Sequence, residues 1–211
     1  MTAQPPISEG DGASAFAADP EGSFHEQTVF WAPEALPTVV PVSQALLPSL
    51  GTSVTLDLNA LSDREIRQAP DGWHAVLRMH GVEHRLWLKE PPLTTSTYVV
   101  ELPLDDNFEM RAHAARRLWR ALNGKPPGTP FHTLSSQRRQ RLALALRALD
   151  ARMGGNTYRV IAEVLFGTKR IHEHDWKTHD LRNRTIRLVQ SGFALMGGGY
   201  RELLRQSRPK K

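Results

Sequence analysis

The sequence predicts an α+β protein with a small N-terminal antiparallel sheet, one helix packed on that sheet, and an all-α C-terminal part. Three observations support this fold class. Residues 53–59 and 73–90 alternate apolar and polar side chains, which is typical of half-buried strands. Beyond residue 135, apolar residues recur three and four positions apart, which is typical of amphipathic helices. Between these regions, residues 124–130 read GKPPGTP, a stiff connector that marks a domain boundary.

The chain is predicted to contain four segments. They are a disordered tail over 1–27, a small α/β domain over 28–125, a helical domain over 131–206 and a basic tail over 207–211. The first segment is rich in Pro, Gly, Ser, Ala and acidic residues, so it buries too little apolar surface to offset the entropy of ordering.

Charge is divided unevenly between the two halves. The net charge is +5, but residues 1–134 carry 10 Lys/Arg and 16 Asp/Glu, whereas residues 135–211 carry 17 and 6. Such a local excess attracts polyanions, so double-stranded DNA is the expected partner, although a solvated basic surface explains the same charge. The chain has no cysteine, and no apolar run approaches the roughly 18 residues that cross a bilayer. We therefore expect a cytoplasmic protein without disulfides or a membrane partner.

The elements of the first half follow from local patterns. Proline recurs four times between residues 33 and 48, which favours an extended segment, held in place by Phe30 and Trp31. Residues 73–90 are predicted to form two strands joined by a tight turn at His80-Gly81. A further strand is predicted at TYVVEL, and a helix over 105–124, which ends at Asn123-Gly124. The expected buried face of that helix consists of Phe108, Ala112, Ala115, Trp119 and Leu122.

Two helices are predicted to open the second half. The first follows Ser135 as a cap and stops at Gly154-Gly155. Its expected apolar face consists of Leu142, Ala145, Leu146, Leu149 and Met153. The second covers YRVIAEVLF, is capped by Asn156 or Thr157 and ends at Gly167. Its expected apolar face consists of Tyr158, Ile161, Ala162, Leu165 and Phe166.

The stretch IAEVLFG is similar to the first helix and turn of helix-turn-helix domains, in which a small residue such as Ala162 lets a second helix approach. That second helix is predicted to start near Thr178. Its apolar face consists of Leu181, Thr185, Leu188, Val189, Gly192 and Phe193. Its polar face consists of His179, Asn183, Arg184, Arg187 and Gln190. Arginine can bridge the guanine acceptors, and Asn or Gln can bridge adenine, so these five are the expected base-reading residues. The alternative is an ordinary amphipathic helix with a solvated face.

The turn between these helices is longer than the usual three or four residues. The intervening TKRIHEHDWKT is either an insertion anchored by Trp176, or a sign that the motif is misassigned.

Two catalytic or metal-based alternatives remain open. Three histidines can ligate zinc or nickel with help from a carboxylate. They are His172, His174 and His179, with Glu173 or Asp175 as the added ligand. A strand-cleaving enzyme is suggested by HDLR with Tyr200 downstream, as in tyrosine recombinases. The absence of cysteine counts against the first, and the position of Arg182 near the apolar side of the helix counts against the second.

The stretches LRALDARMGGNTYRVIAEVLFG and WKTHDLRNRTIRLVQSGFALMGGGYRELL resemble a variant helix-turn-helix family of excision activators and antiactivators from proteobacterial integrative and conjugative elements. The resemblance covers about residues 134–206 and extends loosely back to FWAPE. It implies a helix-turn-helix DNA-binding domain with a lengthened segment between its helices. It also implies either promoter binding by an activator or binding of another regulator by an antiactivator.

The favoured interpretation is a transcriptional regulator, nucleoid-associated and not an enzyme, which activates mobile-element excision or transfer genes. The expected phosphate-binding residues are Arg159, Lys169, Arg170, Lys177, Lys210 and Lys211. No cofactor and no metal are expected. The acidic first half is expected to contact another regulator or a second copy. The competing interpretation is an interaction module, an antiactivator or half of a split activator, that binds another regulator through the helix-turn-helix surface.

Overall fold

The computed structural model describes residues 16, 22–23, 26–45, 55–56, 58, 61–93, 96–167, 176 and 180–205. The chain divides into two compact units, Met1–Phe131 with Ser207–Lys211, and His132–Gln206. A sheet with one helix makes up the first unit and helices make up the second, so the predicted α+β class is confirmed. Most of the predicted tails, 1–27 and 207–211, lies outside the described residues.

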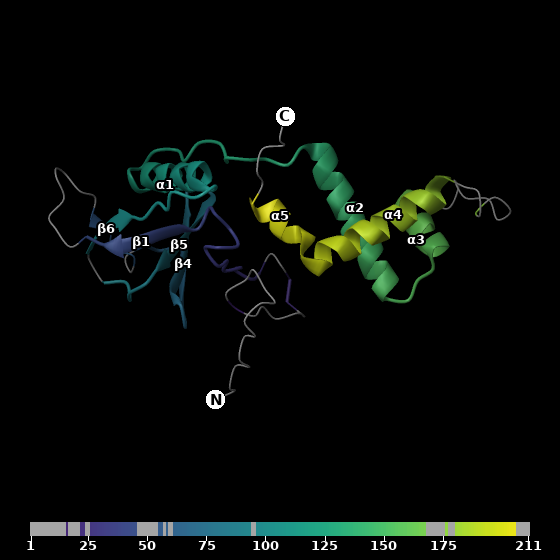
Figure 1. The fold of residues 1–211 in the computed structure, drawn as a ribbon, viewed down its shortest axis with the longest axis horizontal. Helices are drawn as coiled ribbons and strands as arrows, with labels where there is room; N and C mark the ends of the chain where they lie inside the picture. The colour runs from purple at the N-terminus through teal and green to yellow at the C-terminus, as the bar shows by residue number, and fades with distance from the viewer. Residues whose placement is uncertain are drawn as a thin grey trace. The chain divides into compact units, whose positions relative to one another are not determined.

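A six-stranded sheet forms the first unit (Figure 1), in the order β2-β6-β1-β5-β4-β3. The strands are β1 Val40–Gln44, β2 Thr55–Leu56, β3 Arg64–Ala69, β4 Gly72–Met79, β5 Val82–Leu88 and β6 Ser96–Val100. Strand β1 pairs with β5 in parallel, with Val40 beside Leu86, while the other neighbours are antiparallel. The sheet is therefore mixed, which differs from the antiparallel sheet that was predicted.

The hairpin of β4 and β5 confirms the turn predicted at His80-Gly81. Both turn residues have a positive φ, 52° at His80 and 70° at Gly81, as a two-residue hairpin loop requires. Strand β3 was not predicted, because its sequence REIRQA contains one large apolar residue and gives little alternation.

Helix α1, Phe108–Leu122, packs on one face of this sheet (Figure 1). Its buried residues are Met110, Arg111, Ala114, Leu118 and Ala121. The predicted buried face was wrong at its aromatic positions, since Trp119 is 53% exposed and Phe108 37%. The small side chains of Ala114 and Ala121 let the helix approach the sheet closely, which turns the bulky aromatic rings outward. Ala114 and Leu118 join the main core with Leu77, Leu86 and their strand neighbours.

Other side chains of the sheet meet the segment that precedes β1. This segment was predicted to be extended, but between residues 32 and 39 it forms two turns, because Pro33 and Pro37 occupy the second turn position that proline favours. Phe30 is 2% exposed, and the Arg67 guanidinium lies 5.0 Å from its ring centre. Arg85 Nε donates to the Val29 carbonyl at 3.4 Å, and Arg78 donates to the Thr28 hydroxyl. The predicted anchoring by Phe30 is therefore confirmed.

The second unit contains α2 Ser136–Met153, α3 Tyr158–Phe166, α4 Asp180–Ala194 and α5 Tyr200–Arg205. The Ser135 and Thr157 side chains cap α2 and α3, as predicted. A kinked turn, Leu195–Gly199, with Gly198 at φ 112°, separates α4 from α5.

Two small clusters make the core of the second unit. The larger contains Ala145, Ala148, Ile161, Leu188 and Val189. The smaller contains Ala162 and Leu181, with Phe166 and Trp176 packed against it. The predicted apolar faces were wrong at Leu146, Met153 and Phe193, which are 50%, 63% and 44% exposed. Glycine at 192 and alanine at 145 and 148 pack the helices too closely for longer side chains beside them.

Candidate nucleic-acid interface

Helix α4 presents a continuous polar face to solvent. Asn183, Arg184, Arg187 and Gln190 are all exposed, as predicted, while Leu181, Thr185 and Leu188 on the opposite side are buried. His179, the fifth predicted base-reading residue, lies outside the described residues, as does Thr178. A helix that buries one side and exposes Arg, Asn and Gln on the other has the form that enters a DNA major groove.

Close packing holds α4 against the rest of the unit. A Cβ atom at Gly192 would lie 2.7 Å from the Leu149 Cβ and 2.8 Å from the Ala145 carbonyl oxygen, so α4 touches α2 at this glycine. The buried Thr185 hydroxyl donates to the Leu181 carbonyl at 2.7 Å, which leaves no unsatisfied polar group there. The polar face therefore sits on a rigid support.

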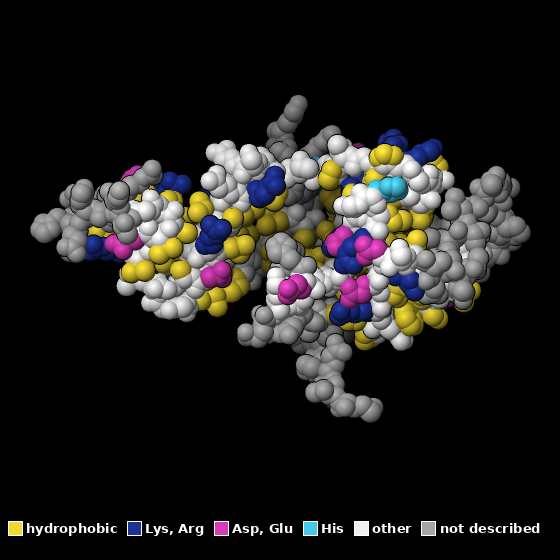
Figure 2. Space-filling model, turned by 180° about the vertical axis from the view of Figure 1, so that it is seen from behind, with side chains coloured by type: hydrophobic (Ala, Val, Ile, Leu, Met, Phe, Trp, Pro, Cys, Tyr) yellow, Lys and Arg dark blue, Asp and Glu magenta, His cyan; other side chains and the backbone are white. Residues whose placement is uncertain are grey.

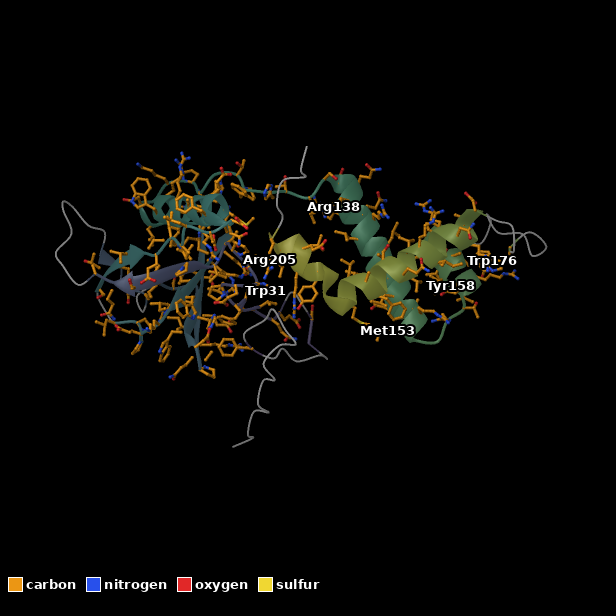
Figure 3. All side chains as sticks on the ribbon, viewed as in Figure 1. Trp31, Arg138, Met153, Tyr158, Trp176 and Arg205 are labelled. Atoms are coloured by element: carbon orange, nitrogen blue, oxygen red, sulfur yellow. The ribbon has the colours of Figure 1, made fainter. Side chains whose placement is uncertain are left out.

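Trp176 anchors the segment that precedes α4. Its ring packs against Ala162 of α3 and Leu181 of α4, and Figure 3 shows it beside these helices, at the far end of the unit from Arg138. The partly buried ring confirms the predicted anchoring by Trp176, and Ala162, 0% exposed, is the small residue at the helix contact.

A groove of about 600 Å³ runs between α4 and the N-terminal half of α2. Its lining from α2 consists of Gln137, Gln140, Arg141 and Leu144. Its lining from α4 consists of Asp180, Arg184, Arg187, Leu188 and Ser191. Three arginines and one aspartate give it a positive balance, and the glutamines add donors and acceptors. The polar face of α4 is thus widened by α2.

The sequence interpretation missed the contribution of α2. The signal is the run SQRRQR at the start of this helix, where the first turn contains no acidic residue. Cations at a helix N-terminus are unfavourable, because the macrodipole places positive charge there. An external anion near Arg138 and Arg139 would offset this unfavourable interaction, because the free N–H groups of the helix end and the two cations attract the same ligand.

Intramolecular contacts orient two of the arginines on α4. The Arg184 guanidinium lies 4.5 Å from the ring centre of Phe166 on α3. Arg187 Nε donates to the Asn183 carbonyl at 3.3 Å, and the Ser191 hydroxyl donates to the Arg187 carbonyl at 2.7 Å. Both side chains remain exposed, so they are positioned while their remaining N–H groups stay available.

Among the described residues, the exposed arginines of this surface, on α2 and α4, have no acidic partner within ion-pair distance. Arg159, a predicted phosphate-binding residue, pairs with Glu163 on its own helix, at 2.9 Å. The other predicted phosphate-binding residues, Lys169, Arg170, Lys177, Lys210 and Lys211, lie outside the described residues.

The alternative sites gain no support from the geometry. The described residues contain no group of three His, Asp or Glu side chains placed to hold a metal ion, and His172, His174 and their neighbours lie outside them. Tyr200 opens α5, and Arg182 is exposed although it lies beside the apolar side of α4, three residues before the buried Thr185. Among the described residues, no helix has both the length and the apolar character that a bilayer crossing needs.

The helical unit, the polar face of α4 and the basic groove together define a DNA-binding domain of the transcription-factor class. A comparison with protein families agrees: residues 101–205 match the RovC DNA-binding domain family, described as "T6SS, Transcription factor, DNA binding domain". This part of the chain, just under half of its length, is similar to that family. No curated protein matches the sequence.

Two features of this match bear on the predictions. The described family is a DNA-binding domain of a transcription factor, which confirms the expected class, but its description does not name mobile elements. The match also begins at Glu101, within the first unit, so it includes α1 as well as the helices of the second unit.

Proposed function

We propose that the protein is a sequence-specific transcriptional activator that places α4 in the DNA major groove. The observation that carries the proposal is the polar face of α4, which lies beside a basic groove on a firmly packed helix. The major groove admits one α-helix, and its base pairs present distinct donor and acceptor patterns to the side chains.

The residues divide into two roles under this proposal. His179, Asn183, Arg184, Arg187 and Gln190 face base edges. Arg141 and the basic start of α2 bind the phosphates beside α4, together with Arg159, Lys169, Arg170, Lys177, Lys210 and Lys211. Phosphate contacts fix the position of the protein and make its affinity depend on salt, whereas base contacts supply sequence information.

We also propose which genes it activates: those for excision or conjugative transfer of a mobile element. The support is the resemblance of residues 134–206 to regulators of such elements. The matched family description names T6SS, so secretion genes are the competing target set. Mapping the bound sites across the genome separates them, because sites confined to secretion promoters would contradict the mobile-element target.

The test of DNA reading replaces one arginine of the polar face. Arg187→Ala should weaken binding to the selected site by about 1–3 kcal/mol and relax its sequence preference, because a bidentate contact to guanine is lost. Arg141→Ala should instead weaken the selected site and random duplex alike, and reduce the salt dependence. Equilibrium binding to both duplexes across a salt series measures these effects.

Arg182→Ala is the matched control, since Arg182 is an exposed arginine of the same helix that does not line the groove. Its affinity should stay near that of the wild type. An unchanged preference in Arg187→Ala would contradict base reading by this residue. The interaction module would be favoured instead if the wild type binds DNA weakly, shows no sequence preference and loses its affinity rapidly as the salt concentration rises.

A further inference from the structure

The change from acidic to basic sequence occurs earlier than the division into two halves suggests. Residues 1–107 carry 5 Lys/Arg and 15 Asp/Glu, whereas residues 108–131 carry 5 and 1. Half of the basic residues among residues 1–131 therefore belong to α1 and the connector behind it. This concentration makes α1 an isolated basic element within an acidic unit.

Three of these cations lie away from the sheet. Met110, Ala114 and Leu118 bury the inner side of α1, while Arg116 and Lys125 are exposed and Arg120 is partly exposed. Dark blue side chains gather over α1 at the upper right of Figure 2. The remaining two arginines face elsewhere: Arg111 is buried and pairs with Asp105, and Arg117 contains a buried Nε atom.

Contacts at the C-terminal end of α1 hold Arg120 and Lys125 in place. Arg120 Nε donates to the Pro126 carbonyl at 2.8 Å, and the Lys125 backbone N–H donates to the Arg120 carbonyl at 2.9 Å. The chain thereby folds back on the helix, and the Lys125 ammonium lies 5.4 Å from the ring centre of Trp119. A cation that is already ordered loses less entropy when it binds a phosphate.

Trp119 adds a feature that an ordinary solvated helix lacks. It is 53% exposed, between Arg116 and Arg120 in sequence and beneath Lys125. An exposed aromatic ring beside arginine and lysine suits a phosphate-binding surface, because the cations can bind phosphate oxygens and the ring holds the Lys125 ammonium by a cation–π contact.

The extent of the family match points in the same direction. The DNA-binding family begins at Glu101 and so includes α1, although α1 packs on the sheet of the first unit and not in the helical core of the second. Packing alone does not explain why a DNA-binding domain would include this helix, whereas a DNA contact does.

We propose that the outer face of α1, formed by Arg116, Trp119, Arg120 and Lys125, is a second DNA contact that binds the phosphate backbone of duplex flanking the site read by α4. This inference rests on the proposed function. The α1 surface is connected to α2 by residues 123–135, so its binding to the same duplex is intramolecular and strengthens the whole complex. It supplies affinity and footprint length without sequence information.

The experiment compares two duplexes. One contains the selected site alone, and the other adds about 12 base pairs on each side, because a connector of this length spans at most about 40 Å at roughly 3.3 Å per residue. The full-length variant Arg116→Glu/Lys125→Glu should bind the long duplex about tenfold more weakly than the wild type, with a salt slope reduced by about 2 and a shorter footprint. On the short duplex, the two proteins should bind alike.

One control variant and one further test variant make the outcome specific. Lys89→Glu reverses an exposed lysine of the acidic region and should leave both affinities nearly unchanged. Trp119→Ala, at an exposed position, should weaken only the long duplex, and a melting curve verifies that each variant is folded. If the wild type and the double variant bind the long duplex with equal affinity, the proposal is overturned. This holds whether or not the double variant has lost binding to a protein partner.

Failure of this proposal is distinguishable from failure of the proposed function. If α1 does not bind DNA, Arg187→Ala still loses site preference while the α1 variants keep the wild-type footprint. If the wild type selects no site at all, the proposed function itself has failed.

Discussion

His84 is a buried titratable side chain where β5 faces α1. It is 6% exposed, and its Nε2 atom has no hydrogen-bond partner among the described residues. Burial lowers the pKa of His84 to about 4, with further lowering by the charges of Arg117 on α1 and His80 at the hairpin turn. The imidazole is therefore neutral at pH 7 in the folded protein.

This lowered pKa makes the first unit sensitive to acid. Between about pH 6.5 and pH 4 the unfolded chain binds a proton at His84 that the folded chain does not, so the free energy of unfolding falls as pH falls. At about 1.4 kcal/mol per pKa unit, the loss approaches roughly 3 kcal/mol near pH 4. Denaturant unfolding at pH 7 and pH 4.5 measures it, and His84→Gln should reduce the difference between the two pH values. A variant that keeps the wild-type pH dependence would show that other groups cause it.

At the scale of single elements, the contact between α2 and α4 depends on Gly192. Gly192→Ala should destabilise the second unit by about 1–3 kcal/mol, because its Cβ atom would meet the Ala145 carbonyl oxygen and the Leu149 Cβ atom. Gly197→Ala is the matched control, with no atom within 4 Å of the added Cβ and a negative φ of −73°. Thermal unfolding compares the two. Equal destabilisation by the two substitutions would mean that α4 can move away from α2 without loss of stability.

Two helix caps and one hairpin turn could be predicted from the sequence, because they depend on neighbouring residues. Ser135 and Thr157 cap the helices that they were expected to cap, and His80-Gly81 forms the expected turn. These signals are local, so the rest of the fold does not alter them.

The sides that helices bury could be predicted only in part. The rule that large apolar residues face the core succeeded for α3, but it failed for α1 and α2, where alanines make the close contacts and Trp119 or Met153 is exposed. The parallel pairing of β1 with β5 was also missed, since it joins residues far apart in the sequence. The polar face of α4 could be predicted because it belongs to a single helix. The groove beside it could not, because it also needs residues of α2, which are far from α4 in the sequence.

At the scale of the whole molecule, each unit has its own hydrophobic core. Leu77 belongs to the core under α1, and Ile161 to the core of the helical unit. We expect Leu77→Ala and Ile161→Ala each to cost about 2–5 kcal/mol, and to speed hydrogen exchange only in the unit that contains the substitution. Exchange followed by peptide mass spectrometry tests this. Faster exchange in both units from either substitution would show that they unfold together.

The position of β1 in the sheet affects the order in which the protein can fold during synthesis. This strand is made first, yet its partners Leu86 and Val100 follow roughly 45 to 60 residues later. Its apolar run around Val39 and Val42 therefore waits without partners while the ribosome makes β5 and β6. Pro37 and Pro41 lie within or next to that run, and proline opposes pairing with strands of other chains. We therefore expect these prolines to hinder pairing of the run with other chains until β5 and β6 have been made.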